Sequence, residues 1–92
     1  MKLDIVTPEG ALFSGEIEAI SVPGVNGTFE MLNNHAPIVA ILTQGKIRIK
    51  GNNLTVADEV AGKFEFSNNE LILPINSGTV EMKNNKVIVL AE

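Results

Sequence analysis

The sequence predicts an all-β protein with a single domain, and three observations support this prediction. Residues that favour turns, namely Gly, Pro, Asn and Ser, recur at short spacing along the whole chain. The segments between them are short and rich in Ile, Val, Leu and Phe, and none repeats its apolar residues at helical spacing. Short β-branched segments between frequent turns are typical of a sandwich or barrel. A length of 92 residues suits one domain with a thin core.

The N-terminal segment alternates in the way that a half-buried strand does. Leu3 and Ile5 are apolar, whereas their neighbours Lys2 and Asp4 are charged. Successive side chains of a strand point to opposite faces, so this pattern predicts a strand with one face in the core.

Two apolar segments in the middle of the chain lack simple alternation. The segment 17–22 changes phase between Ala19 and Ile20, which indicates either a β-bulge or a strand that passes from one sheet to another. The segment 38–42 is apolar at every position, and we expect it to be buried on both faces.

The second half of the chain alternates again in two places. Ile47 and Ile49 alternate with charged residues along the chain, and Phe64 and Phe66 lie on either side of Glu65. We expect these residues in the core, together with the other two aromatic residues of the chain, Phe13 and Phe29.

The C-terminal region predicts a hairpin, whereas the region before it is poorly patterned. Asn84 and Asn85 separate two apolar segments and form a plausible two-residue turn, because Asn tolerates positive φ. Residues 51–63 show little pattern, and we expect a short strand at 54–57 followed by a mobile loop.

Composition argues against most kinds of chemistry. The chain has no Cys and one His, so we expect no metal site and no cofactor. Up to Gly45 the only basic residue is Lys2, within a net charge of −4, which argues against nucleic acid as a partner. No apolar run approaches the roughly 20 residues that span a bilayer, so we expect no direct membrane insertion. The absence of Cys fits a reducing compartment such as the cytosol.

His35 is the residue on which any catalytic dyad would have to be built. It follows Asn33 and Asn34 and precedes Ala36 and Pro37, so it lies on a polar corner between two apolar segments. No Ser or Thr of the chain stands in a recognisable nucleophile elbow. We therefore expect no catalytic residue, and we interpret His35 as a structural or interface residue.

Several motifs, taken in order, closely resemble the ε subunit of F-type ATP synthase. The resemblance covers nearly the whole chain in register. It rests on LDIVTPEG from Leu3, LFSG from Leu12, VPG from Val22, GTF from Gly27, NHAP from Asn34, GKIRI from Gly45 and VIVLAE from Val87.

This resemblance implies a β-sandwich of about ten strands, spanning residues 1–92, at the foot of the central stalk. Such a subunit lies against the γ subunit and on the polar loops of the membrane c-ring. It catalyses no reaction of its own and couples ion-driven rotation of the ring to γ during ATP synthesis. The implied location is peripheral, on the cytoplasmic face of the energy-transducing membrane.

The resemblance also implies which residues contact each partner. Where the motifs match, the turn that faces the c-ring would comprise Val25, Asn26, Thr28 and Glu30, and the positions that face γ would be Thr7, His35 and Ala40.

The sequence departs from the family pattern at two kinds of position. Glu30 stands where the family often has Gly, and Asn33 stands where it often has Pro, which changes the shape expected of this corner. Longer members also continue past the equivalent of Glu92 into a helical hairpin that can inhibit ATP hydrolysis and in some binds ATP. The sequence given ends there, so we expect neither function in it.

One alternative function satisfies the composition equally well. A free-standing sandwich could bind a small ligand or a peptide at a sheet edge. Such a module would be stabilised thermally by its ligand, whereas a coupling subunit would bind γ without any small molecule.

Overall fold

The computed structural model describes all residues from Met1 to Glu92 and confirms the all-β prediction. It contains ten strands and one short 3-10 helix. The elements are β1 Lys2–Thr7, β2 Gly10–Glu16, β3 Ala19–Gly24, β4 Gly27–Leu32, β5 Ile38–Leu42, β6 Gly45–Lys50, η1 Ala61–Lys63, β7 Glu65–Ser67, β8 Glu70–Ile75, β9 Gly78–Lys83 and β10 Lys86–Ala91.

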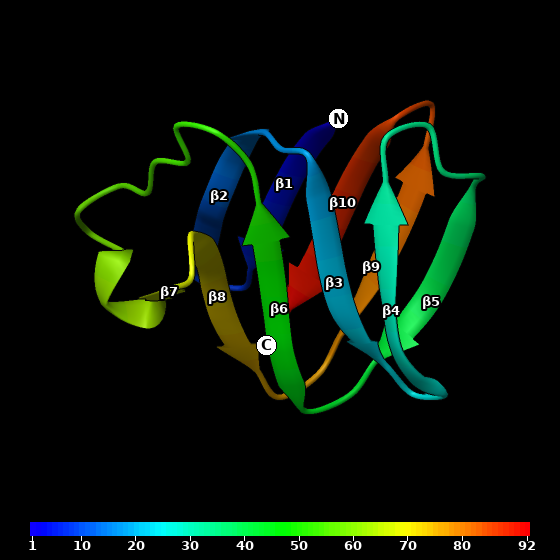
Figure 1. Cartoon of the computed structure of the whole chain (residues 1–92). Helices are drawn as coiled ribbons and strands as arrows, with labels where there is room; N and C mark the ends of the chain where they lie inside the picture. Colours follow the sequence, from blue (N-terminus) through cyan, green and yellow to red (C-terminus); the bar gives the residue numbers. More distant parts are fainter.

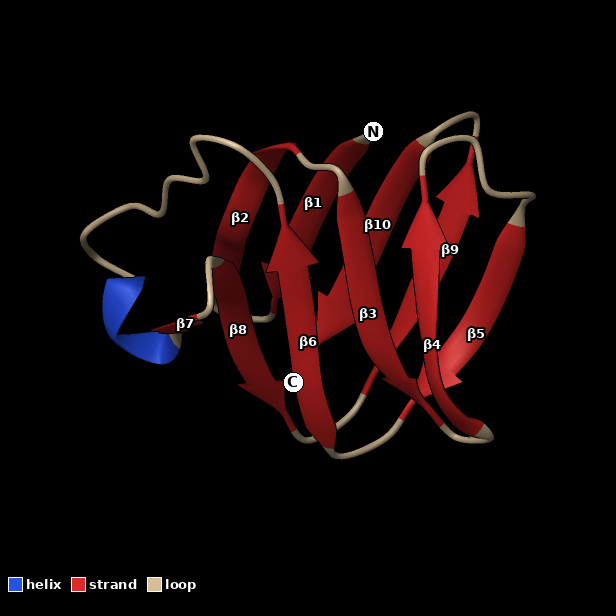
Figure 2. Ribbon diagram, in the orientation of Figure 1, coloured by secondary structure: helices blue, strands red, loops and turns tan.

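The strands form two layers that face each other (Figures 1 and 2). One layer has the order β2-β1-β10-β9-β5, and the other contains β3, β6, β8 and β7, with β4 paired to β3. Strand pairing joins the two layers at a single corner, where Gly24 of β3 pairs with Leu42 of β5. The fold is therefore the predicted sandwich.

The only parallel pair in the molecule joins the first strand to the last. Leu3 lies opposite Val87, and Ile5 lies opposite Val89. Strand β10 pairs on its other side with β9, where the two backbones approach so closely that a Cβ atom at Gly78 would collide with the carbonyl oxygen of Leu90. The first and last strands thus lie side by side within one layer.

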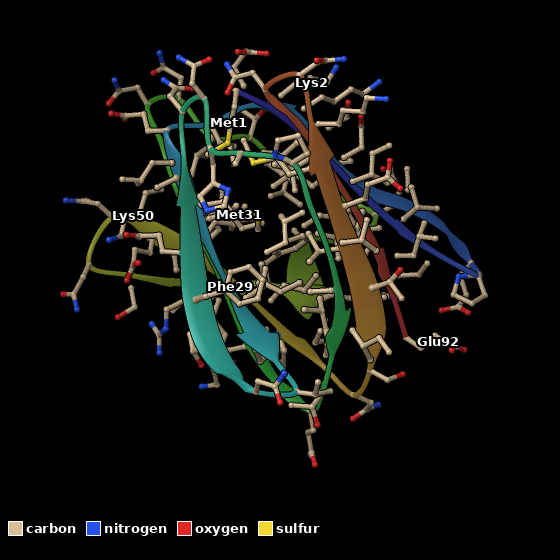
Figure 3. The ribbon with its side chains drawn as sticks, turned by 90° about the vertical axis from the view of Figure 1, so that its right-hand side faces the viewer. Met1, Lys2, Phe29, Met31, Lys50 and Glu92 are labelled. Carbon is tan, nitrogen blue, oxygen red and sulfur yellow. The ribbon has the colours of Figure 1, made fainter.

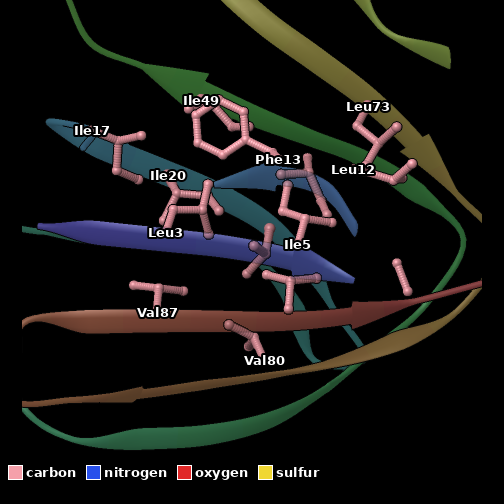
Figure 4. Packing of buried hydrophobic residues seen from close by; sticks show 14 of the residues in the cluster. Leu3, Ile5, Leu12, Phe13, Ile17, Ile20, Ile49, Leu73, Val80 and Val87 are labelled. Carbon is pink, nitrogen blue, oxygen red and sulfur yellow. The ribbon is translucent and has the colours of Figure 1, made fainter. Parts of the chain in front are cut away.

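The core consists of apolar side chains from both layers (Figure 4). The alternation predicted for β1 and β6 is confirmed, because Leu3, Ile5, Ile47 and Ile49 are fully buried. No polar or charged side chain is buried with them. Burial of apolar surface, at about 25 cal/mol per Å², is therefore the main source of stability.

Segment 17–22, with its change of phase, contains the crossing of the chain between layers. The backbone N–H of Ile17 donates to the carbonyl oxygen of Met1 beside β1, whereas that of Glu18 donates to Lys50 of β6 in the other layer. Consecutive residues thus bond to opposite sheets, so the chain passes from one sheet to the other within this segment, at residues 17 and 18 and just before β3. Ala19 and Ile20, where the phase changes, are both buried inside β3. The register shift of the structure lies elsewhere, between Ile5 and Val6 of β1.

That register shift places two consecutive residues of β2 in the core. Ile5 pairs with Phe13, and Val6 pairs with Ala11, so Leu12 is the extra residue of the shift. Both Leu12 and Phe13 are buried. A bulge reorients one side chain, which allows two neighbours in sequence to face inward.

Two predictions for residues 51–66 are wrong. Residues 54–57 form no strand, and the only regular element before β7 is η1. Half-buried Leu54, Val56 and Val60 nevertheless pack against the core. Of the two phenylalanines that follow, Phe64 is buried, but Phe66 is 68% exposed, because β7 is a three-residue edge strand with nothing over its outer face.

The prediction that β5 is buried on both faces is also wrong. Leu42 is buried and Ile38 and Ala40 are half-buried, whereas Val39 is 76% exposed and Ile41 is 63% exposed. In a two-layer sandwich each layer covers only one face of the other, so the second face of β5 is left uncovered.

The predicted C-terminal hairpin is confirmed. Strands β9 and β10 pair along their whole length around Asn84 and Asn85, which have φ angles of 53° and 59°. Positive φ at both central residues matches the type I′ turn, whose twist suits a hairpin.

Candidate partner interfaces

The tip of the hairpin between β3 and β4 carries three of the residues predicted to face the c-ring. Val25 and Asn26 form the turn, Thr28 follows it on β4, and all three are exposed. Gly27 has a φ of 119°, which an L side chain rarely adopts. The backbone N–H of Val25 donates to the carbonyl oxygen of Ile41, so the tip is attached to β5 in the other layer.

The fourth predicted residue, Glu30, lies further along β4 on the same side as Thr28. One carboxylate oxygen of Glu30 is 3.4 Å from Nζ of Lys50 on β6, and both side chains are about half exposed. An exposed pair of this kind contributes little to stability, at most about 1 kcal/mol. The carboxylate of Glu30 is thus partly compensated by Lys50 yet accessible to a partner.

His35 lies at the opposite end of β4 from the hairpin tip. Its backbone N–H donates to the carbonyl oxygen of Leu32 and closes a turn, and its Nδ1 is 2.8 Å from the carbonyl oxygen of Ala36. Residues 33–37 are all exposed and belong to no strand. The imidazole has no side-chain hydroxyl or carboxylate partner, which does not suit a catalytic dyad.

The structure does not bring the three residues predicted to face γ together in one cluster. Thr7 ends β1 near the chain's C-terminus, away from the N-terminal end where His35 lies (Figure 1). The hydroxyl of Thr7 donates to the carbonyl oxygen of Gly10. Ala40 lies in the middle of β5, half-buried against the core. Any surface that includes all three residues must extend over much of one side of the sandwich.

The side of the sandwich between β4 and β5 is open and apolar, and we call it the β4–β5 edge. Four of the six exposed large hydrophobic side chains lie on these two strands or on the hairpin tip beside them. They are Val25, Leu32, Val39 and Ile41. Figure 3 shows this side, with Phe29 and Met31 pointing from β4 toward the opposite layer. Phe29, Ile38 and Ala40 are only half-buried here, so the core itself is reached from this edge.

Of the exposed apolar residues of the β4–β5 edge, Val25 was predicted as an interface residue from the sequence, whereas Leu32, Val39 and Ile41 were not. An uninterrupted apolar strand suits burial between two layers as well as exposure on an outer sheet face, and periodicity does not separate these cases. The one available signal is the polar corner that precedes the strand, because an exposed start disfavours a fully buried strand.

No cluster of His, Cys, Asp or Glu in the structure could hold a metal ion. No helix of the chain is both long enough and apolar enough to cross a membrane. The features that stand out are therefore surfaces, namely the hairpin tip, the β4–β5 edge and the His35 corner.

Comparison with known proteins gives one consistent result. The family model described as "ATP synthase, Delta/Epsilon chain, beta-sandwich domain" matches residues 1–92. The chain is 37% identical to the ATP synthase epsilon chain of Chlorobium limicola, over 99% of this chain and 88% of that one. It is 40% identical to the epsilon chain of Chlorobaculum tepidum, over 98% and 86% of the two chains.

Other relatives are longer than this chain. The match with the epsilon chain of Desulforamulus reducens, at 35% identity, spans 99% of this chain but 58% of that one. Among solved structures, a chain of the Tetrahymena thermophila mitochondrial ATP synthase central stalk and c-ring matches with a TM-score of 0.71 and 14% identity. That match covers 99% of this chain and 62% of the other, and it shows a shared fold.

Proposed function

This chain belongs to the delta/epsilon-chain family of ATP synthase, and we propose that it is a non-catalytic subunit of the central stalk. In this role it connects the γ subunit to the polar loops of the c-ring, so that rotation of the ring reaches the catalytic head. Its location is peripheral to the energy-transducing membrane, through the assembled enzyme.

The observation that best supports this proposal is the exposed apolar surface of the β4–β5 edge. Val39 and Ile41 are more than half exposed in a chain that has no buried polar side chain and no cluster for a metal. Val39 and Ile41 alternate onto the same outer face of β5, and adjacent exposed apolar side chains of this kind mark a protein interface. A binding role fits this surface better than a reaction does.

Transmission of torque requires two separate contacts on one rigid body. The hairpin tip and the His35 corner lie at opposite ends of β4, with the β4–β5 edge between them. The strands that carry them are held by ladders of backbone hydrogen bonds and by a close-packed apolar core. A force applied at one end would therefore reach the other without deforming the domain.

We assign the c-ring contact to the hairpin tip and the neighbouring face of β4. Val25 offers an apolar side chain, Asn26 and Thr28 offer hydrogen-bonding groups, and Glu30 offers a carboxylate. A basic residue on the ring loops would pair with Glu30 in competition with Lys50.

We assign the γ contact to the His35 corner and to the β5 strand of the β4–β5 edge, which leaves Val25 of the hairpin tip to the c-ring contact. Ala40, Val39 and Ile41 would supply apolar contact area, with His35 at the rim, where a polar residue is typical of interfaces. Thr7 would mark the far limit of the contact.

The proposal is tested by titrating the chain with its cognate γ subunit. We expect submicromolar affinity without any small molecule, weakened about threefold by His35→Ala, since truncation of a side chain at an interface rim costs less than about 1 kcal/mol. The matched control is Glu30→Lys, which reverses an exposed charge outside the proposed γ contact. It should leave γ binding unchanged and weaken binding to the isolated c-ring.

Two results would contradict these assignments. Absence of γ binding by the unaltered chain would remove the coupling role. Equal weakening of γ binding by both variants would show that the two partners do not use separate surfaces.

A further inference from the structure

The side chain of Asn33 lies at the centre of a hydrogen-bond network at the end of the sandwich. Its Oδ1 accepts from the α-ammonium nitrogen of Met1 at 2.8 Å and from Nδ2 of Asn85 at 3.4 Å. The Oδ1 of Asn85 accepts in turn from the backbone N–H of Asn34 at 2.8 Å. Three segments that are far apart in sequence are thereby joined through two amide side chains.

The partners of Asn33 are themselves held in place by the sandwich. The ammonium of Met1 also donates to the carbonyl oxygen of Ile17 at 3.1 Å and is buried. The carbonyl oxygen of Asn85 accepts from the backbone N–H of Lys2 at 3.2 Å. The network is therefore anchored in the layer that contains β1 and β10.

The segment tied down by this network has little other attachment. Residues 33–37 are exposed and belong to no strand. Within the turn, Asn34 has a φ of 62° and the backbone N–H of His35 donates to Leu32. This bond closes the turn on itself, but it does not fix the direction in which the turn projects from the end of β4. The contacts of Asn33 and Asn85 supply that second constraint.

We propose that Asn33 and Asn85 form an amide clamp that positions the His35 corner for partner binding. Asn33 and Asn85 are positioning residues, because they act through the corner and need not touch the partner. The existence of the clamp is independent of the proposed function, whereas its effect on γ binding rests on it. A corner held in its binding geometry loses less conformational entropy on association, which raises affinity.

The clamp is tested first in the free chain of residues 1–92 by amide hydrogen exchange. Asn85→Gly removes the side chain but keeps the turn, because Gly adopts the φ of 59° found at this position. We expect exchange at the Asn34 amide to accelerate about two- to tenfold, the range that corresponds to one lost hydrogen bond. Asn84→Gly is the matched control, since it alters the same turn at a φ of 53° without touching the clamp.

The effect on binding is tested with two substitutions at Asn33. Asn33→Leu has a similar size but no acceptor, so γ affinity should fall severalfold. Asn33→Asp keeps an acceptor for the Met1 ammonium and should restore the affinity. The unfolding temperature of both variants is measured alongside, because Asn33→Leu also removes an acceptor from the buried Met1 ammonium. Loss of γ affinity at a temperature where both variants are fully folded separates positioning from a general loss of stability.

Unchanged exchange at Asn34 in the Asn85→Gly variant overturns the clamp. Accelerated exchange with full γ affinity in Asn33→Leu overturns its role in binding. Failure of the coupling proposal itself is recognised separately, because the unaltered chain would then not bind γ while the exchange result would still hold.

Discussion

Asparagine has a special role among the residues of this protein. Every non-glycine residue with positive φ is an Asn, and these residues are Asn34, Asn53, Asn68, Asn69, Asn84 and Asn85. The short Asn side chain can hydrogen-bond locally, so it tolerates the left-handed conformation better than other L residues do. One of these residues, Asn85, also belongs to the clamp, where its side-chain Oδ1 accepts from the backbone N–H of Asn34.

The two phenylalanines on either side of Glu65 predict opposite effects of substitution. Phe64→Ala should lower the free energy of unfolding by about 3–4 kcal/mol, since Phe64 is buried and its loss leaves a cavity. Phe66→Ala is the matched control and should change the free energy by no more than about 0.5 kcal/mol, since Phe66 is largely exposed. Urea denaturation of both variants measures the difference. Equal losses in the two variants would contradict the burial seen in the structure.

How far the sequence predicts a residue depends on the range of the interactions that place it. The turn at Asn84 and Asn85 was predicted because the cause is local, in the φ preference of the two residues themselves. The exposure of Phe66 was not, because it depends on the position of β7 at the edge of its sheet. The contacts of Asn33 were also missed, since its partners Met1 and Asn85 are distant in sequence.

Strand β5 shows the same limit at the scale of an element. An apolar strand placed between two layers would be stabilised on both faces, but β5 has a second layer on one face only. Its outer face therefore contributes little to folding and remains available for binding. The strand itself and its length were predictable from the sequence, whereas the absence of a covering layer follows from topology.

The double substitution Val39→Thr and Ile41→Thr separates folding from binding. Both side chains are mostly exposed, so the free energy of unfolding should change by less than about 1 kcal/mol. Affinity for γ, measured by calorimetric titration, should fall at least about tenfold, because apolar contact area at the proposed interface is lost. Leu42→Ala in the same strand is the control, with an expected loss of about 2–4 kcal/mol in stability. Full affinity in the double variant would place γ elsewhere.

At the scale of the whole molecule, the parallel pairing of β1 with β10 organises one complete layer. Strand β10 lies between β1 and β9, and its side chains Val87, Val89 and Ala91 are buried in the core. Removal of this strand would separate the β1–β2 pair from the rest of the layer and expose the core along its whole length.

Deletion of residues 86–92 should therefore abolish cooperative folding. We expect the shortened chain to show no thermal transition by circular dichroism. The free energy lost with a central strand is larger than the free energy of unfolding of a small domain. Leu90→Ser is the control, because Leu90 is a residue of the same strand that is 54% exposed, and it should unfold cooperatively near the temperature of the unaltered chain. A cooperative transition in the deletion variant would show that β10 is dispensable.

The pairing of the first strand with the last also has a consequence for synthesis on the ribosome. β1 and β2 emerge early and can form a hairpin, but an isolated hairpin is at best marginally stable in water. The apolar face of this hairpin, with Leu3, Ile5 and Phe13, stays incompletely buried in the nascent chain until residues 86–91 have left the exit tunnel and can pair with β1. Until then the exposed apolar surface of the incomplete domain is a target for chaperones. The time at which the domain can fold is therefore set by the synthesis of its final strand.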